Sequence, residues 1–223
     1  GIGMLLYLQK YSRPDICNVV RELSKCASAP NEAAFKEMLR TINFVLGSNE
    51  LGLRLKPKFN KSLDEWVVVV FTDSDWAGDK ESRRSITGFI VFLMGCPVLW
   101  RSRQQKSVSL SSAEAEYYAL SEAASEIKFL VQLLMTMGIQ VKLPVVVRVD
   151  NVGAIFMSEN INTASKSKHI DLRAKFVTEM VNDGFLKVVF VKSAENLADP
   201  FTKNLSGDVY EGQTPEYMVD RPA

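Results

Sequence analysis

The apolar residues of the first 47 positions recur three and four residues apart, the spacing that gathers side chains on one face of a helix. They are Val19, Val20 and Leu23, followed by Phe35, Met38, Leu39, Ile42, Val45 and Leu46. Pro30 and Asn31 separate the two groups, and a proline interrupts a helix because it has no amide hydrogen to donate. The pattern therefore predicts two helices, the second ending near Gly47.

A polar stretch with a proline, KPKFNKSLDE at 56–65, follows this helical part and is typical of a connector. We therefore predict a helical segment at 1–55, a linker at 56–65, a main domain at 66–205 and a polar tail at 206–223. The tail contains proline and glycine and is expected to be loose. The helical segment is expected to dock on the main domain and to supply no catalytic group.

The main domain begins with patterns typical of strands. WVVVVFTD at 66–73 and PVVVRVD at 144–150 are short, continuous runs rich in β-branched residues, which are typical of strands buried on both faces of a sheet. SITGFIVFLMG at 85–95 and PVLWRSR at 97–103 flank a turn at Gly95–Pro97 and predict an antiparallel hairpin. FLKVVFVK at 185–192 predicts a further strand.

Helical spacing returns between these strands. From Ser112 to Met137 the apolar residues keep it, Ser111 or Ser112 can cap the start, and Gly138 can end the helix. Shorter helices are predicted at 152–158, 169–182 and 196–203. The order of strands and helices predicts an α/β fold with a mixed sheet, helices on its faces and a site at the carboxyl ends of its parallel strands.

The amino-acid composition is that of a globular protein. The 223 residues are 47% hydrophobic and 24% charged, which is ordinary for one or two globular domains and excludes a disordered or fibrous chain. The 27 Lys and Arg nearly balance the 26 Asp and Glu, with a net charge of +1. Any attraction to nucleic acid must therefore come from a local basic surface.

Cysteines and apolar runs indicate the compartment. Cys17, Cys26 and Cys96 lack metal-ligand spacing and predict neither a zinc site nor a disulfide framework. No apolar run reaches the ~20 residues that cross a bilayer, and the start GIGMLLYLQK is too short for a signal peptide. We expect a soluble protein of a reducing compartment, not secreted and without a membrane partner. A chain that opens inside an apolar segment is also expected to be part of a longer polypeptide.

Asp73 and Asp150 each end a β-branched run. If the two strands are parallel neighbours, the carboxylates lie close together and repel each other unless a cation separates them. Oxygen ligands without His or Cys favour Mg²⁺ or Mn²⁺ over zinc. The alternative for either residue alone is an Asp that caps a loop or a helix.

Further carboxylates stand at Glu114 and Glu116, which open the long helix, and at Asp199. The two glutamates are two residues apart and therefore point about 200° away from each other. Glu116 shares the apolar stripe of Leu120, Ile127, Val131 and Leu134, so we expect it to face the strand ends and Glu114 to face solvent. The alternatives are a glutamate pair favoured by the helix dipole and a surface Asp at 199.

Five segments, in this order, carry a resemblance to a known family: FTDSDWAGDKESRRSITGF, WRSRQQKSVSLSSAEAEYYALSEA, RVDNVGAI, SKHIDLRAKFV and NLADPFTKNL. They resemble the ribonuclease H domain of copia-type retrotransposon polyproteins. The stretch from YLQKYSRPD to FVLGS is similar to the segment that joins reverse transcriptase to that domain. The resemblance runs from about Tyr7 to Leu205.

The resemblance implies a ribonuclease H-like mixed five-stranded sheet with flanking helices, preceded by the small helical segment. It implies hydrolysis of the RNA strand of an RNA/DNA hybrid with two Mg²⁺ ions, or Mn²⁺. The catalytic and metal-binding carboxylates of the family carry over to Asp73, Glu116, Asp150 and Asp199. Many cellular ribonucleases H have a His before the last carboxylate; VKSAENLAD has none, so His-assisted product release is not implied.

The implied partners are the RNA/DNA hybrid and the reverse transcriptase portion of the same polyprotein. The implied compartment is a cytoplasmic retroelement particle, with the nucleus as the alternative. The candidates for substrate contact are the basic residues Arg83, Arg84, Arg101, Arg103, Lys106 and Lys168. Such side chains neutralise nucleic-acid phosphates; the alternative is a solvated surface. His169 either caps a helix or contacts the hybrid, and Trp76 and Trp100 are expected to pack in the core.

Two other function classes stay open. A catalytically silent module would bind nucleic acid or support a polymerase without cleaving, although all four acidic positions are occupied. A nucleotide-binding protein would need a glycine-rich loop after one of the buried strands, and neither strand has one. Cleavage of an RNA/DNA hybrid separates the enzyme from the silent module.

Overall fold

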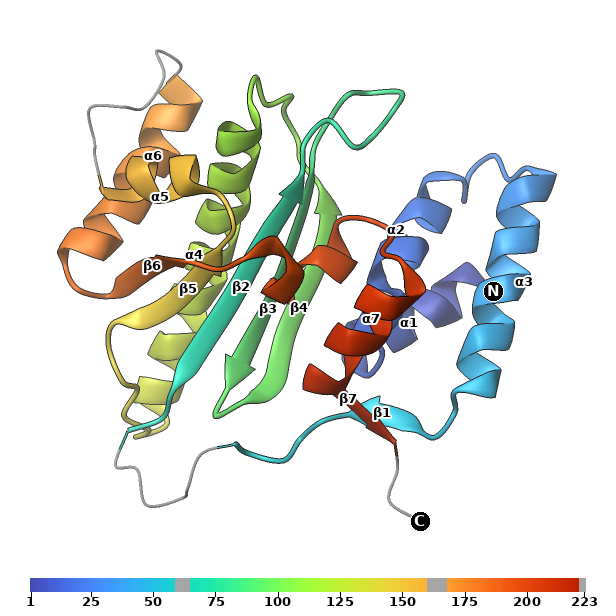
Figure 1. The fold of residues 1–223 in the computed structure, drawn as a ribbon, viewed down its shortest axis with the longest axis horizontal. Helices are drawn as coiled ribbons and strands as arrows, with labels where there is room; N and C mark the ends of the chain where they lie inside the picture. The colour runs from blue at the N-terminus through green and yellow to red at the C-terminus, as the bar shows by residue number, and fades with distance from the viewer. Residues whose placement is uncertain (59–64, 160–167, 221–223) are drawn as a thin grey trace.

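The computed structural model describes residues 1–58, 65–159 and 168–220 (Figure 1). Its centre is a five-stranded sheet with the order β4-β3-β2-β5-β6. The strands are β2 (Val68–Asp75), β3 (Ile86–Leu93), β4 (Cys96–Gln104), β5 (Val145–Val149) and β6 (Leu186–Phe190). β2, β3 and β4 are antiparallel neighbours, whereas β2, β5 and β6 run parallel. The predicted mixed five-stranded sheet is therefore confirmed.

The predicted hairpin is formed by β3 and β4, with its turn one residue earlier than expected. The turn residues are Met94 and Gly95, whose φ angles are 54° and 84°. Positive φ at both central positions is the turn geometry that matches the right-handed twist of the two strands.

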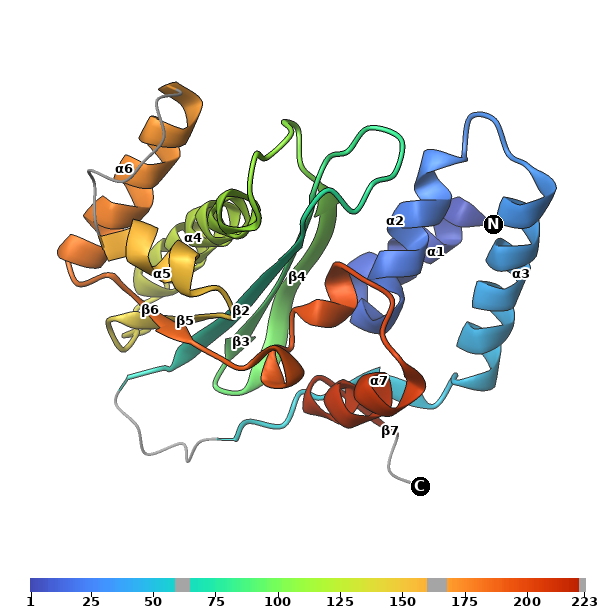
Figure 2. The same ribbon diagram turned by 45° about the horizontal axis from the view of Figure 1, so that its top comes forward.

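Helices α4 (Ser112–Thr136), α5 (Val152–Glu159) and α6 (Lys168–Asn182) lie together on one face of the sheet (Figure 2). The predicted long helix is confirmed, with Ser111 as its N-cap, accepting a bond from the Glu114 amide. Its apolar stripe packs on Val70 and Val147 of the sheet in one core cluster. The face of α4 that is buried against the sheet is therefore the one that carries the apolar stripe.

The helical segment consists of α1 (Ile2–Tyr11), α2 (Cys17–Lys25) and α3 (Glu32–Gly47). The first predicted helix is divided by a 3₁₀ turn, η1 (Pro14–Ile16), because Pro14 cannot donate the amide bond that would continue α1. The side chain of Asn31 caps α3. The segment contacts the sheet, since Trp100 Nε1 of β4 donates to the carbonyl of Gln9 at 2.7 Å. Within the predicted linker, residues 59–64 lie outside the described residues.

The expectation of a loose tail is wrong. Residues 207–213 form α7 (Gly207–Gln213), and β7 (Met218–Asp220) pairs antiparallel with β1 (Leu51–Leu53). Tyr217 and Met218 are buried, with exposed fractions of 0% and 1%, and they pack beside Phe201. Two apolar residues in a polar stretch produce no periodicity, so the sequence pattern did not reveal this packing.

The helix predicted at 196–203 is also not formed as expected. The segment contains a single 3₁₀ turn, η4 (Asp199–Phe201). Pro200 removes one amide donor, and the Asn196 side chain accepts a hydrogen bond from the Ala198 amide, which is therefore not used in a helix.

Among the described residues, no helix combines the length and the apolar character needed to span a bilayer.

Candidate active site

Two carboxylates lie side by side just beyond the last paired residues of β2 and β5. Asp150 follows the end of β5, whereas β2 continues two residues past Asp73, to Asp75, and so is longer than the sequence predicted. The parallel register pairs Phe71 with Arg148, and two residues further on the same register places Asp73 opposite Asp150. Asp73 is 1% exposed, and its Oδ2 accepts a hydrogen bond from the Thr202 hydroxyl. Asp150 accepts a 2.8 Å bond from Ser193 Oγ.

Helix α4 adds the third carboxylate. Glu116 lies in its first turns, is 5% exposed, and accepts a 3.1 Å bond from the Ser74 amide. Carboxylate oxygens of Asp73, Glu116 and Asp150 all lie within 4.8 Å of one another. Glu114 points elsewhere: its Oε2 accepts a 2.7 Å bond from the Leu110 amide, which together with the Ser111 cap satisfies free amides at the helix start.

Asp199 stands next to this group on η4, outside the three-residue cluster. It is 6% exposed, and its Oδ2 lies 3.0 Å from Lys203 Nζ, which is also 3.7 Å from Asp73 Oδ2. Lys203 and Thr202 therefore join Asp199 to the cluster. Neither residue was singled out from the sequence; Lys203 could have been noticed because it follows Asp199 by four residues, the spacing of a helical ion pair.

The pKa values of three of these carboxyls, Asp73, Glu116 and Asp199, are raised. Burial, with the charges of Asp73 and Asp150, raises the pKa of Glu116 to about 9. Burial and Asp73 raise the pKa of Asp199 to about 7, against the opposing effect of Lys203. Burial also raises the pKa of Asp73, although Lys203 and Thr202 act in the opposite direction. Burial, together with repulsion between the carboxylates, thus favours the protonated forms in this site when no cation is bound.

The donor set fits hard divalent cations. Oε2 of Glu116 and Oδ1 of Asp199 are buried and have no hydrogen-bond partner among the described residues. A buried carboxylate oxygen without a partner is costly, and a cation would satisfy it. The clustered ligands are oxygen atoms alone, the type that Mg²⁺ and Mn²⁺ prefer.

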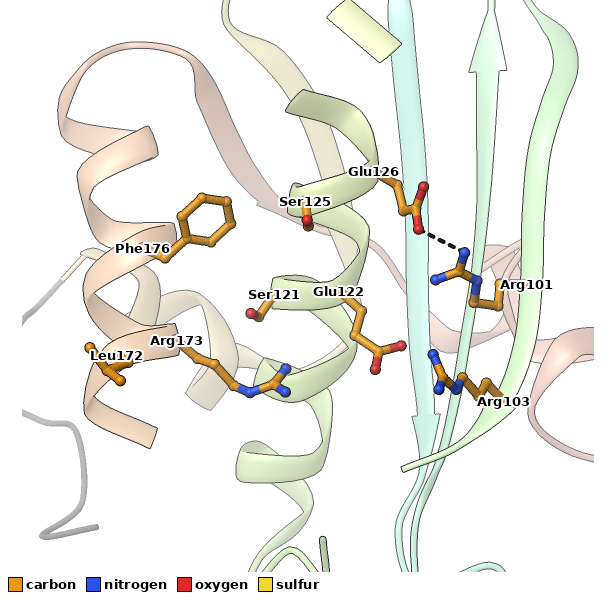
Figure 3. Close-up of a pocket in the computed structure, with 9 residues that line it drawn as sticks. All are labelled: Arg101, Arg103, Ser121, Glu122, Ser125, Glu126, Leu172, Arg173 and Phe176. Atoms are coloured by element: carbon orange, nitrogen blue, oxygen red, sulfur yellow. Dashed lines mark ion pairs between the residues drawn. The ribbon is translucent and has the colours of Figure 1, made fainter. Parts of the chain in front are cut away.

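The described predicted basic residues lie on β4 and on the loops beside it: the Gln105 amide donates to the Ser85 carbonyl, so the segments of Arg84 and Lys106 are neighbours. Arg83 and Arg84 are exposed in the loop between β2 and β3, and Lys106 is exposed after β4. Arg101 and Arg103 line an open groove of about 460 Å³ between β4, α4 and α6 (Figure 3). The side chain of Lys168, like that of His169, lies outside the described residues.

In this groove two of the three arginines, Arg101 and Arg173, already have partners. Arg101 pairs with Glu126 of α4 at 2.7 Å, drawn as the dashed line in Figure 3. Arg173 of α6 stacks on Tyr118, 3.7 Å from its ring centroid, and donates to its hydroxyl.

The expectation that both tryptophans pack in the core is confirmed for one of them. Trp100 packs against the second core cluster, whereas Trp76 is 49% exposed and donates from Nε1 to the Ser109 carbonyl.

Comparisons with known proteins give relatives over nearly the whole chain. It is 36% identical over 220 residues to the Retrovirus-related Pol polyprotein from transposon RE1 of Arabidopsis thaliana, covering 99% of this chain. It is 33% identical over 211 residues to the corresponding polyprotein from transposon TNT 1-94 of Nicotiana tabacum, covering 95% of this chain. The chain spans about 15% of the length of each relative.

Among solved structures, the chain is similar to LC11-RNase H1, isolated from compost by a metagenomic approach. The TM-score is 0.45 at 17% identity, over 61% of this chain and 92% of that chain. No family model matches the chain. From the sequence relatives, we conclude that the chain belongs to the copia-type retrotransposon Pol polyproteins, as a segment of such a polyprotein.

Proposed function

We propose that this segment is a ribonuclease H that hydrolyses the RNA strand of an RNA/DNA hybrid with Mg²⁺, or Mn²⁺, as cofactor. The observation that supports it is the gathering of Asp73, Glu116 and Asp150, with ligand atoms within 4.8 Å, at the ends of two parallel strands. The motifs FTDSDWAGD, SSAEAEYYA and RVDN, which resemble the ribonuclease H motifs of the copia family, contain these three residues. Asp199 is proposed as the fourth carboxylate.

In this mechanism the carboxylates act as ligands. Asp73, Glu116, Asp150 and Asp199 would hold two divalent cations, which would supply an activated water and stabilise the charge on the leaving 3′ oxygen. Asp73, held by the Thr202 hydroxyl, and Asp150, held by Ser193, are fixed in direction before a cation arrives. Glu116 is held in place through the Ser74 amide and keeps its second oxygen free for a ligand. Because both partners of Lys203 belong to the site, its ammonium group balances part of the negative charge.

Substrate contacts are proposed for the exposed basic residues around this site. Arg83 and Arg84 belong to the loop that follows β2, the strand that carries Asp73, and Lys106 belongs to the connection between β4 and α4. Arg103 is exposed on β4, whereas Arg101 would have to leave Glu126 before it could bind a phosphate. The logarithm of the binding constant for the hybrid falls linearly with the logarithm of the salt concentration. Each phosphate contact that is lost should reduce the steepness of this line by about one unit.

The chain's partners and compartment are part of this proposal. A nuclease segment in a Pol polyprotein would act on the hybrid made by the reverse transcriptase portion of the same polyprotein. A cytoplasmic retroelement particle is the compartment in which that synthesis would take place.

An end-labelled RNA/DNA hybrid tests the proposal. Incubated with the wild-type chain and Mg²⁺, it should give RNA fragments that EDTA abolishes and that RNA/RNA and DNA/DNA duplexes do not give. The variant Asp150→Asn should bind the hybrid and leave it intact. Binding without cleavage by the wild-type chain would instead identify the silent module, and cleavage that Asp150→Asn retains would contradict the metal site.

A further inference from the structure

Helix α2 of the helical segment contacts the turn that carries Asp199. Arg21 Nη1 donates to the Phe201 carbonyl at 3.1 Å and to Ser102 Oγ at 2.7 Å. Ser102 Oγ of β4 in turn donates to the same Phe201 carbonyl. Two donors, one from α2 and one from the sheet, therefore hold this single carbonyl oxygen.

A second contact lies one turn earlier on the same face of α2. Asn18 Nδ2 donates to Oδ1 of Asn204 at 2.8 Å. Residues three apart on a helix are neighbours on its surface, so Asn18 and Arg21 act on one stretch of chain. Together they hold both ends of residues 201–204.

The stretch that α2 holds has few internal hydrogen bonds, although Phe201 packs in the second core cluster. η4 is a three-residue 3₁₀ turn, and such short turns have too few internal hydrogen bonds to be stable alone. Its internal bonds run from the amides of Thr202 and Lys203 to the Asp199 carbonyl. Yet this stretch delivers Thr202 and Lys203 to Asp73.

The side chain of Arg21 is largely buried. Its side chain is 11% exposed, and Glu22 balances it at 2.6 Å. A guanidinium group that is withdrawn from water is stable only when its donors are satisfied, and here the Phe201 carbonyl and Ser102 accept from it. These contacts hold the guanidinium group of Arg21 in place, so that it can position the turn at residues 199–201.

We propose that Arg21 is a positioning residue of the carboxylate site: from the helical segment it fixes the Phe201 carbonyl, so that Asp199 and Lys203 reach Asp73. Asn18 is the second support. The helical segment then supplies no catalytic group and is still part of the framework of the site. The consequence for catalysis rests on the proposed function, whereas the positioning is a property of the metal-free protein.

Amide hydrogen exchange in the metal-free protein tests the positioning. Arg21→Ala should speed exchange of the amides of residues 201–203 by about tenfold, because a hydrogen bond to a charged donor is lost. Arg21→Lys should restore part of the protection. The matched control is Lys25→Ala, which lies one turn further on α2 and pairs with Glu22 and with Asp79 of the loop after β2, but not with residues 201–204. It removes a charge from the same helix and should leave these amides unchanged.

Steady-state cleavage of the hybrid gives the second readout. Arg21→Ala should lower kcat by about tenfold, the factor that corresponds to one misplaced charged contact, while KM changes by less than about twofold. Lys25→Ala should leave kcat unchanged, since its partner Asp79 belongs to the loop of Arg83 and Arg84 and any effect there would fall on KM. If Arg21→Ala does not fold, Arg21→Lys and Asn18→Ala carry both measurements.

The outcomes separate the two proposals. Unchanged exchange at residues 201–203 in Arg21→Ala overturns the positioning, whether or not the wild-type chain cleaves. An equal effect of Lys25→Ala overturns it too, because general loosening of α2 would then explain the result. Faster exchange in Arg21→Ala together with a wild-type chain that does not cleave supports the positioning and overturns the nuclease function.

Discussion

The ammonium group of Lys203 lies 3.0 Å from Oδ2 of Asp199 and so places a positive charge inside the carboxylate site. The same group is 3.7 Å from Asp73 and opposes the effect of burial on the pKa of both aspartates. It therefore stabilises the ionised carboxylates when no metal is bound. A cation that binds beside it must do so against its charge.

Lys203→Met should therefore make the thermal stability of the protein more dependent on divalent cations. Without metal its Tm should fall at neutral pH, because Asp73 and Asp199 lose their counter-charge. Adding Mg²⁺ should raise the Tm of the variant by more than it raises the Tm of the wild-type chain, since repulsion of the cation is removed. Lys187→Met, at an exposed position on β6, is the control. A smaller Mg²⁺-induced shift in Lys203→Met would show that Lys203 does not compete with the cation.

Glu114 and Glu116 provide a matched pair on one helix. Glu116→Gln should lower hybrid cleavage by orders of magnitude, because Glu116 faces Asp73 and Asp150 and a neutral amide is a poor ligand for Mg²⁺. Glu114→Gln should change cleavage by less than about tenfold, since its side chain binds the Leu110 amide and a lost cap costs stability only. The measurement is single-turnover cleavage of the labelled hybrid. If Glu114→Gln lowered cleavage more than Glu116→Gln, the assignment of Glu116 to the metal site would be wrong.

The raised pKa values predict how stability depends on pH. In the folded chain the carboxyls of Glu116 and Asp199 have pKa values of about 9 and about 7, above the 4.5 and 3.8 of free carboxyls. The folded state therefore binds more protons than the unfolded state between these values. The free energy of unfolding should accordingly fall as the pH rises from about 5 to about 9.

Urea unfolding in EDTA across this range measures the effect. Glu116→Gln should show a smaller decrease and should be more stable than the wild-type chain at the alkaline end, because it carries no charge to repel Asp73 and Asp150. Stability that rises with pH, or an equal slope in the variant, would contradict the carboxylate repulsion.

The tail is expected to be structural. Tyr217→Ala should lower the free energy of unfolding by about 3 kcal/mol, because a large, fully buried side chain leaves a cavity. The control is Val219→Ala on the same strand, at a position that is 46% exposed, which should cost less than about 0.5 kcal/mol. Chemical denaturation of both variants provides the comparison. Equal, small losses would mean that the tail does not contribute to the core.

The strands, the long helix and the orientation of Glu116 could be predicted from the sequence because their signals are local. A run of β-branched residues identifies a buried strand wherever it lies, and strand ends fixed the positions of Asp73 and Asp150. Helical periodicity separated Glu116 from Glu114, because 100° per residue places them on different faces. The resemblance to copia-type motifs pointed to the same residues.

The tertiary structure alone brought the remaining parts of the site together. Thr202 contacts Asp73 across 129 positions of sequence, and Arg21 reaches Phe201 across 180. β7 pairs with β1 although neither three-residue strand has a recognisable pattern. Such contacts depend on single polar or aromatic side chains that meet only after the sheet and its helices have packed. Periodicity reports what one element buries, and it does not report which distant residue it will meet there.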